Sequence, residues 1–401
     1  MIQLFKSITK HKIISFLLII CMILPVIPML GVSAAVASGI TYYENNFELP
    51  LYGSTGCPVK NIPGIPVGTA FTILSEDGNN LKVKLQNGTE TTIAKAFCMI
   101  NLPDVIPSIK YDITNSYSSV FKIRGANIAG LTGTSLYQNG TSKKNNPRLG
   151  KDEFLVPVLY ETAIKIAAAQ KKALSEDYTF VIYEAYRPTY AQNKIYSAYS
   201  PLVTADITGE YPVSWFAASG KSNHQEGYAV DLSLAKVNSV SFVPLANPAY
   251  KIANLTFTNC NMVTPIHDLT VDSAVYQYQA GMVIYDKTAW QSYTQTAAFA
   301  GNADCKRLQK YCTDAGLTPF ASEWWHMNDI DARNALGDRT DILGDWELTT
   351  NASILDISQT LTRDLTASGG EILIPAVKEY IVSVDVKTRI MIVQLTEGML
   401  R

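Results

Sequence analysis

Cysteine is the first component that this sequence uses sparingly. The 401 residues include six cysteines at wide spacings with no Cys-x-x-Cys pair, and five of them lie beyond the N-terminal apolar run. An odd number of cysteines at such spacings excludes a disulfide scaffold. The absence of a Cys-x-x-Cys pair excludes a metal site built on that motif. Cys305 and Cys312 are expected to be small core residues of a helix, whereas a link between Cys57 and Cys98 stays open.

An excess of charge of one sign is also lacking. Thirty-three Lys and Arg residues stand against 35 Asp and Glu residues, the formal net charge is −2, and no basic block stands out. A nucleic acid or another polyanion is therefore excluded as the expected partner. The chain is long enough to bury a full core and to form more than one domain.

Long apolar runs are limited to the N-terminus. Residues 13–30 form such a run, between a start with three lysines and the small residues Ala35-Val36-Ala37. This order predicts a secretory signal peptide over residues 1–37, which would place the bulk of the protein outside the cytoplasm. An uncleaved membrane anchor is the alternative, and two prolines within the run weaken it.

Residues 40–101 have the pattern of short strands joined by tight turns. Asp77-Gly78 and Asn87-Gly88 flank the alternating segment of residues 81–85. Asp-Gly and Asn-Gly between strands are strong hairpin signals, so we expect a small antiparallel barrel. The pattern resembles the bacterial SH3-like modules that accompany cell-wall enzymes, and a generic β-rich segment is the alternative.

The most informative stretch is residues 221–232, in which His224 and Asp231 lie seven positions apart with Gly227 between them. On a flat strand an odd separation sends two side chains to opposite faces, so they share one ion only if the backbone turns between them. Gly227 can supply this turn. The stretch predicts half of a metal site, against the alternative that His224 is a satisfied core histidine.

A second half-site lies in residues 322–326, where Glu323 and His326 are three positions apart and can face the same way on a turn. With His224 and Asp231, His326 completes a set of nitrogen and oxygen ligands. Three such ligands and an open position are typical of a catalytic zinc site, because a structural site closes its fourth position. Glu323 is then left as a base for the proton of a water molecule.

A third segment, residues 181–188, is an apolar strand that ends in Arg187 and Pro188. The proline restricts the backbone, so the guanidinium at the strand end suits an oxyanion or a carboxylate. The alternative is a salt bridge from Arg187 to Glu184 or another carboxylate. Helical spacing of apolar residues predicts three helices, over residues 154–174, 189–200 and 303–315.

The order Tyr-Arg-Pro, Ser-x-His-x-x-Gly-x-Ala-x-Asp-Leu and Glu-Trp-Trp-His resembles the zinc D-Ala-D-Ala peptidases, which include the D-Ala-D-Ala dipeptidases and D,D-carboxypeptidases of vancomycin resistance. The resemblance covers residues 111–346. It implies an α+β fold in which a central antiparallel sheet is flanked by helices, preceded here by the SH3-like barrel. Residues 347–401 lie outside this pattern; part of them resembles the C-terminus of the 16S rRNA processing factor, and their role stays open.

The resemblance also implies roles for individual residues, with Zn²⁺ as the cofactor. The expected zinc ligands are His224, Asp231 and His326, with Glu323 as the catalytic base and Arg187 holding the developing oxyanion.

Substrate binding is assigned on the same basis. The motif residues Ser222 and Tyr186 are expected to contact the substrate, and Asp268 is the candidate for holding the free ammonium of a dipeptide. Asp272 competes for that role. His267 is expected to be a cleft or surface residue, with a metal ligand as the alternative.

The expected function is that of a secreted zinc metallopeptidase that hydrolyses the D-Ala-D-Ala bond at the bacterial cell wall. Glu-Trp-Trp-His and Asp268 favour the free dipeptide as substrate, whereas the signal peptide and the SH3-like module favour a peptidoglycan stem peptide and hence a D,D-carboxypeptidase. The alternative from another class is a catalytically inert, zinc-containing cell-wall-binding protein. Because the chain has both Glu323 and Arg187, the enzyme is favoured.

Overall fold

The computed structural model describes residues 47–111, 156–187, 192–197, 217–244, 251–337, 381–385 and 390–393, with short gaps inside several of these ranges. The chain divides into Met1–Ile40 and Thr41–Arg401, and all described residues belong to the second unit. The expected signal peptide and most of residues 347–401 therefore lie outside the described part. Within that part, no helix has the length and apolar character needed to cross a membrane.

The first sheet is antiparallel throughout and has the strand order β4-β3-β2-β1-β5-β7. Its strands are β1 (Thr55–Pro58), β2 (Phe71–Asp77), β3 (Asn80–Leu85), β4 (Glu90–Ala94), β5 (Cys98–Asn101) and β7 (Pro157–Leu159). Both predicted hairpins are confirmed, and Gly78 and Gly88 have positive φ in the turns. In β3 the apolar Leu81 and Val83 are buried, as the alternation of side chains along a strand requires.

The last pair of this sheet connects segments that are far apart in sequence. Met99 of β5 is in register with Leu159 of β7, which directly precedes helix α6 (Tyr160–Leu174). Between β5 and β7 the chain forms the short helix α2 (Leu102–Val105) and strand β6 (Lys110–Tyr111). The region before residue 101 and the expected peptidase region thus share one sheet, and the predicted domain boundaries stay a prediction.

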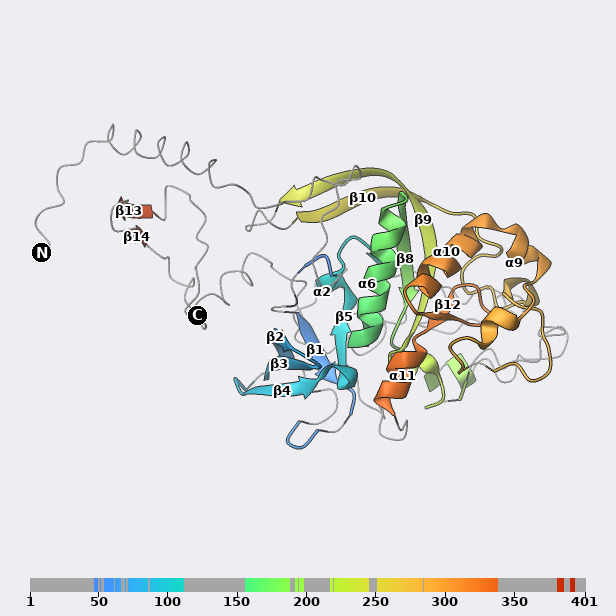
Figure 1. Cartoon of the computed structure of the whole chain (residues 1–401), viewed down its shortest axis with the longest axis horizontal. Helices are drawn as coiled ribbons and strands as arrows, with labels where there is room; N and C mark the ends of the chain where they lie inside the picture. Colours follow the sequence, from blue (N-terminus) through green and yellow to red (C-terminus); the bar gives the residue numbers. More distant parts are fainter. Residues whose placement is uncertain are drawn as a thin grey trace, which may run out of the picture. The chain divides into compact units, whose positions relative to one another are not determined.

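Two helices pack together on the second sheet, and both match the apolar periodicity of the sequence. In α6, Ala163, Ile166 and Ala167 are buried, and the helix packs against strand β8 and helix α10 (Figure 1). It begins later than the pattern predicted because Pro157–Leu159 extend as a strand. Helix α10 (Ala303–Asp314) is capped by the Asn302 side chain, which accepts from the Cys305 backbone N–H.

The second sheet has the order β11-β12-β9-β8-β6, with β10 paired to β9. Its strands are β8 (Tyr178–Glu184), β9 (Ala229–Pro244), β10 (Lys251–Asn259), β11 (Thr318–Pro319), β12 (His326–Asn328) and β6. All its pairs are antiparallel except β6 with β8. The long β9–β10 ribbon and the helices beside this sheet are visible in Figure 1. Antiparallel sheets with separate helices confirm the α+β class.

The remaining elements are short. They are η2 (Lys95–Phe97), η3 (Asn223–Glu226), η4 (Val271–Ser273), η5 (Ala289–Ser292), α9 (Ala297–Gly301), α11 (Ile330–Leu336) and the antiparallel hairpin of β13 (Ile381–Asp385) and β14 (Ile390–Val393). Of the predicted helix over residues 189–200, the described residues 192, 193 and 195–197 are helical. Cys305 and Cys312 are buried core residues as predicted, and Cys57 and Cys98 are buried with free thiols.

Candidate metal centre

The register of the second sheet positions the centre of the site. Asp231 lies on the inner strand β9, opposite His326 of β12 on one side and Glu184 of β8 on the other. A register shift between Ile182 and Glu184 puts Glu184, the last residue of β8, opposite Asp231. Three side chains that are distant in sequence therefore lie side by side across neighbouring strands.

His224 reaches the same place through a turn. The 3₁₀ helix η3 ends at Glu226 and is followed by its C-cap Gly227, whose φ of 75° lies in the left-handed region; β9 begins two residues after Gly227. The turn predicted between His224 and Asp231 is thus confirmed. It is also fastened to the first sheet, because the Leu159 N–H donates to the Gly227 carbonyl over 2.8 Å.

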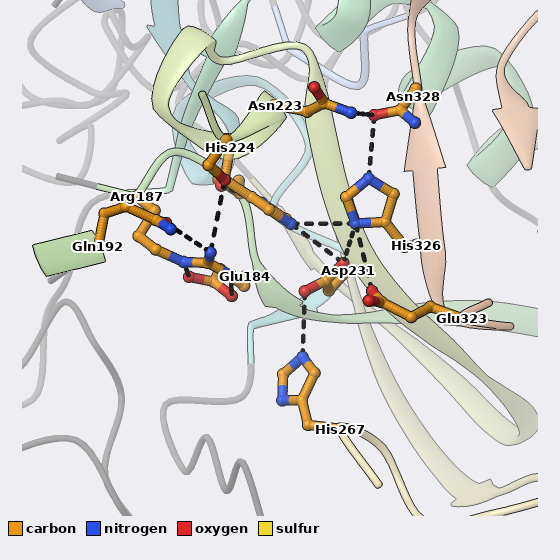
Figure 2. A network of polar contacts seen from close by, with 12 residues as sticks. Glu184, Arg187, Gln192, Asn223, His224, Asp231, His267, Glu323, His326 and Asn328 are labelled. Carbon is orange, nitrogen blue, oxygen red and sulfur yellow. Dashed lines mark hydrogen bonds and ion pairs between the residues drawn. The ribbon is translucent and has the colours of Figure 1, made fainter. Parts of the chain in front are cut away.

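The ligand atoms of His224, Asp231 and His326 converge, as Figure 2 shows. His224 Nε2 lies 3.1 Å from His326 Nδ1. Asp231 Oδ1 lies 3.4 Å from His224 Nε2 and 3.0 Å from His326 Nδ1. All three side chains are at most 7% exposed. The structure therefore brings together the residues that were expected as zinc ligands.

The outer hydrogen bonds of the two histidines define which nitrogen carries the proton. His224 Nδ1 lies 2.7 Å from the Ala185 carbonyl, which only accepts, so the proton is on Nδ1. His326 Nε2 lies 2.9 Å from Asn328 Oδ1, and the same oxygen accepts from Asn223 Nδ2 over 3.0 Å. The His326 proton is then on Nε2. Both rings consequently direct a lone pair toward Asp231.

This donor set fits a divalent cation. Two nitrogen lone pairs face each other at 3.1 Å, and the buried Asp231 Oδ1 has no hydrogen-bond donor among the described residues. A buried polar atom without a partner is costly, and a cation between these atoms would satisfy all of them. Two imidazoles and one carboxylate are ligands that zinc accepts in catalytic sites.

Burial and neighbouring charges act differently on the two carboxyl groups at the centre. Burial by itself raises the pKa of Asp231, but the adjacent side chains of His224, His267 and His326 favour the anion more strongly and hold the pKa well below its usual range. Burial raises the pKa of Glu323 to about 7, and the charge of Asp231 acts in the same direction, against His326 and Arg187. Asp231 is thus suited to remain an anion, and Glu323 to exchange a proton near neutral pH.

Glu323 faces the centre from a turn just before β12. The His326 N–H donates to the Glu323 carbonyl over 3.3 Å, and Glu323 Oε2 lies 3.7 Å from His326 Nδ1. The expectation that both side chains face the same way on a turn is confirmed. The adjacent Trp324 and Trp325 are buried core aromatics, and their packing keeps water away from this side of the centre.

Arg187 is held rigidly beside the centre. Its Nε and Nη2 donate to the two Glu184 oxygens over 2.6 and 2.7 Å, and Nη1 donates to Gln192 Oε1 over 2.8 Å. The salt bridge to Glu184, which the sequence left open as an alternative, is present. Nη1 also lies 3.5 Å from Ser222 Oγ, so these two predicted site residues are brought together. A bidentate pair fixes both the charge and the direction of the guanidinium.

Two of the residues expected to bind substrate have other surroundings. Tyr186 is buried in an apolar cluster with Met99, Leu159 and Tyr228, so its side chain belongs to the packing beneath the site. Asp268 is half-buried in a turn, and the contact with the metal-site residues is made by its neighbour His267. The expectation that His267 is a cleft or surface residue is wrong, because this side chain is 0% exposed.

Three participants were missed as members of the site: Glu184, Asn328 and His267. Glu184 lies two positions before the Tyr-Arg-Pro motif, and Asn328 follows His326 by two positions, so both could be suspected as partners of motif residues. Their contacts depend on the register between strands, which the sequence does not show.

Residues 158–261 match a protein-family model described as VanY, D-alanyl-D-alanine carboxypeptidase. The matched segment includes Arg187, His224 and Asp231, and it ends before Glu323 and His326. A search of curated proteins finds no significant match to the chain. The family match confirms, for residues 158–261, the relation to the D-Ala-D-Ala peptidase family that the sequence motifs indicate.

Proposed function

We propose that this protein is a zinc-dependent D,D-carboxypeptidase that removes the terminal D-alanine from peptidoglycan stem peptides ending in D-Ala-D-Ala. One observation carries the proposal: His224 Nε2, Asp231 Oδ1 and His326 Nδ1 converge with their lone pairs directed at a common point, and two of the three lie in the matched segment. The arrangement has the ligand types of a catalytic zinc site.

Zinc held by these three residues would polarise the scissile carbonyl and lower the pKa of a water to about 7. Glu323 accepts the proton of the attacking water and later donates it to the leaving amine of D-alanine. Its carboxylate faces the ligand His326, and its pKa of about 7 allows both the acceptance and the release of a proton. Asp231 stays ionised and holds its ligand oxygen toward the two histidines.

Arg187 supplies positive charge where the oxyanion develops. Its charge lowers the pKa of Glu323, so the guanidinium and the proposed base interact electrostatically. Because Glu184 fixes the guanidinium from behind, little reorganisation is needed during the reaction. Ser222, next to Arg187 Nη1, is proposed to help hold the substrate.

The proposal extends to where the protein works. The N-terminal apolar run supports secretion, and the hairpins β2–β3 and β3–β4 support an SH3-like module that binds the cell wall. The fold of the catalytic region is proposed to be that of the zinc D,D-peptidases. A peptidoglycan stem peptide is the substrate that such a location would present.

The test measures D-alanine released by the zinc-loaded protein from an N-acylated peptide ending in D-Ala-D-Ala and from the free dipeptide. Release from the acylated peptide is expected. Release from the dipeptide alone would replace the proposal with a dipeptidase, which the Glu-Trp-Trp-His motif favours. Bound zinc without release from either would show an inert zinc-containing binding protein.

Glu323→Gln tests the base directly. The variant is expected to retain zinc and to lose at least ~100-fold in kcat, since general-base catalysis contributes about 10²–10⁴-fold. Glu90→Gln, on the distant strand β4, is the matched control and should retain full activity on a soluble peptide. Full turnover by Glu323→Gln would contradict the assignment of the base.

A further inference from the structure

His267 contacts the proposed metal centre although it belongs to none of the motifs. Its Nε2 lies 3.1 Å from Asp231 Oδ2, while Asp231 Oδ1 is the oxygen that faces His224 and His326. Figure 2 shows the His267 ring approaching Asp231 from the side opposite to the two other histidines. The two oxygens of one carboxylate therefore have separate partners.

The His267 ring is fixed by aromatic packing. Tyr183 of β8 and Trp325 of the Glu-Trp-Trp-His motif contact it edge-on, with centroid distances of 6.2 and 5.6 Å and interplanar angles of 80° and 89°. Edge-to-face contacts of this kind are favourable and directional. The ring cannot turn away from Asp231 without breaking its packing between these two side chains.

The backbone at His267 is also special. Its φ of 57° lies in the left-handed region, which few non-glycine residues adopt. Hydrogen bonds on the C-terminal side, from Asp268 N to the Pro265 carbonyl and from Thr270 N to the Asp268 carbonyl, hold the turn. Strained residues persist where the surroundings determine them strongly, and such residues concentrate at functional sites.

From this geometry we infer that His267 is a positioning residue for the metal ligand Asp231. It donates its Nε2–H to Oδ2, so that the carboxylate cannot rotate and Oδ1 stays directed at the point where His224 and His326 converge. The inference rests on the metal site of the proposed function. Hydrogen bonds to ligating carboxylates of this kind are worth about 10–100-fold in metal affinity.

Glu184, Asp231 and His267 also lie close enough to be considered as a second metal site, since their ligand atoms are within 4.8 Å of one another. The contacts of Glu184 oppose that interpretation. Both of its oxygens accept from Arg187, so a cation at this position would lie beside a guanidinium. The geometry is that of a hydrogen bond to a ligand, and one metal ion per chain is expected.

Two variants separate the hydrogen bond from the packing. His267→Phe keeps an aromatic ring between Tyr183 and Trp325 but removes the donor. His267→Gln loses the ring and keeps an N–H near the position of Nε2. The zinc dissociation constant is measured by competition with a chromogenic chelator, together with metal content per chain and the visible spectrum of the cobalt-substituted protein. Circular dichroism in the presence of a chelator verifies that each variant folds.

The expected result is a zinc dissociation constant that is about 10–100-fold higher in His267→Phe and within about threefold of the original in His267→Gln. The cobalt spectrum should change in His267→Phe and be restored in His267→Gln. Unchanged affinity in His267→Phe, or equal losses in both variants, would overturn the positioning role. Two metal ions in the original protein and one in His267→Phe would also overturn it, in favour of a second site. An original protein that binds no zinc would instead refute the proposed function.

Discussion

Gly227 joins the two parts of the first half-site, and replacing it with alanine tests how the fold holds that half-site. Gly227 has a φ of 75°, and an added Cβ would lie 2.1 Å from Met99 Cε. Gly220 has the same φ of 75°, and an added Cβ there meets no atom of the described residues within 4 Å. Gly220→Ala is therefore a matched control that contains the backbone strain without the overlap.

The backbone strain and the overlap with Met99 lower the free energy of unfolding separately, and each loss can be worked out by itself. Placing an alanine in the left-handed region costs about 1–2 kcal/mol in either variant. At position 227 the overlap with Met99 adds about 1–3 kcal/mol, the range for overpacking. Met99 is 0% exposed and packed against Leu159 and Tyr228, so its methyl end has only packed surroundings to move into. Gly227→Ala should thus lose about 2–5 kcal/mol, against about 1–2 kcal/mol for Gly220→Ala.

Urea unfolding of the metal-free proteins measures both losses, and zinc titration of the folded variants shows whether the half-site is disturbed. Gly227→Ala should be the less stable variant by at least ~1 kcal/mol and should bind zinc more weakly. Met99→Ala in the same chain should recover part of the stability loss in a double-mutant cycle. Equal stability of Gly227→Ala and Gly220→Ala would refute the idea that the turn at Gly227 packs closely against Met99.

Three further predictions concern single side chains. Asn328→Ala removes the acceptor that fixes the His326 tautomer, and should weaken zinc binding about 10–100-fold by chelator competition, whereas Asn328→Asp retains an acceptor and should lose less. Burial raises the pKa of Glu48 to about 8 from 4.5, so the folded state keeps a proton that the unfolded chain has lost. Stability should therefore fall as the pH rises from about 4.5 to about 8, by up to about 1.4 kcal/mol per pH unit, and urea unfolding of Glu48→Gln should lack this slope. Asp329 is 0% exposed, caps α11 and pairs with Lys165 over 2.5 Å, so Asp329→Ala should lower the free energy of unfolding by about 3–5 kcal/mol in thermal or urea unfolding. Asp329→Asn should retain the cap, and unchanged stability of Asp329→Ala would show that the ion pair contributes nothing.

Local signals explain what the sequence could predict. Gly78 and Gly88 indicated hairpin turns because the conformation of a turn depends on the residue types at a few consecutive positions. Gly227 indicated the turn between His224 and Asp231 for the same reason. The residues expected as zinc ligands could be picked out because each half-site has its own internal spacing. Helix α10 was predicted within a residue at its C-terminal end because Gly316 follows it with a φ of 90°.

Long-range register explains what the sequence could not predict. Strand β7 was read as the start of a helix because its pairing with β5, across a separation of more than 50 residues, is not a local property. Glu184 reaches Asp231 only through the register shift in β8. His267 was expected to be a cleft or surface residue because the motif residues already supply a full set of metal ligands, although Tyr183 and Trp325 enclose it in the folded chain.

The most direct measurement is D-alanine release from an N-acylated peptide ending in D-Ala-D-Ala, followed while zinc is removed with a chelator and then restored. The metal centre proposed at His224, Asp231 and His326 predicts release by the loaded protein, loss of release on removal of zinc, and recovery with one zinc per chain. His326→Ala should abolish both zinc binding and release. Release that persists in the metal-free protein, or in His326→Ala, would contradict a zinc-dependent reaction at this centre.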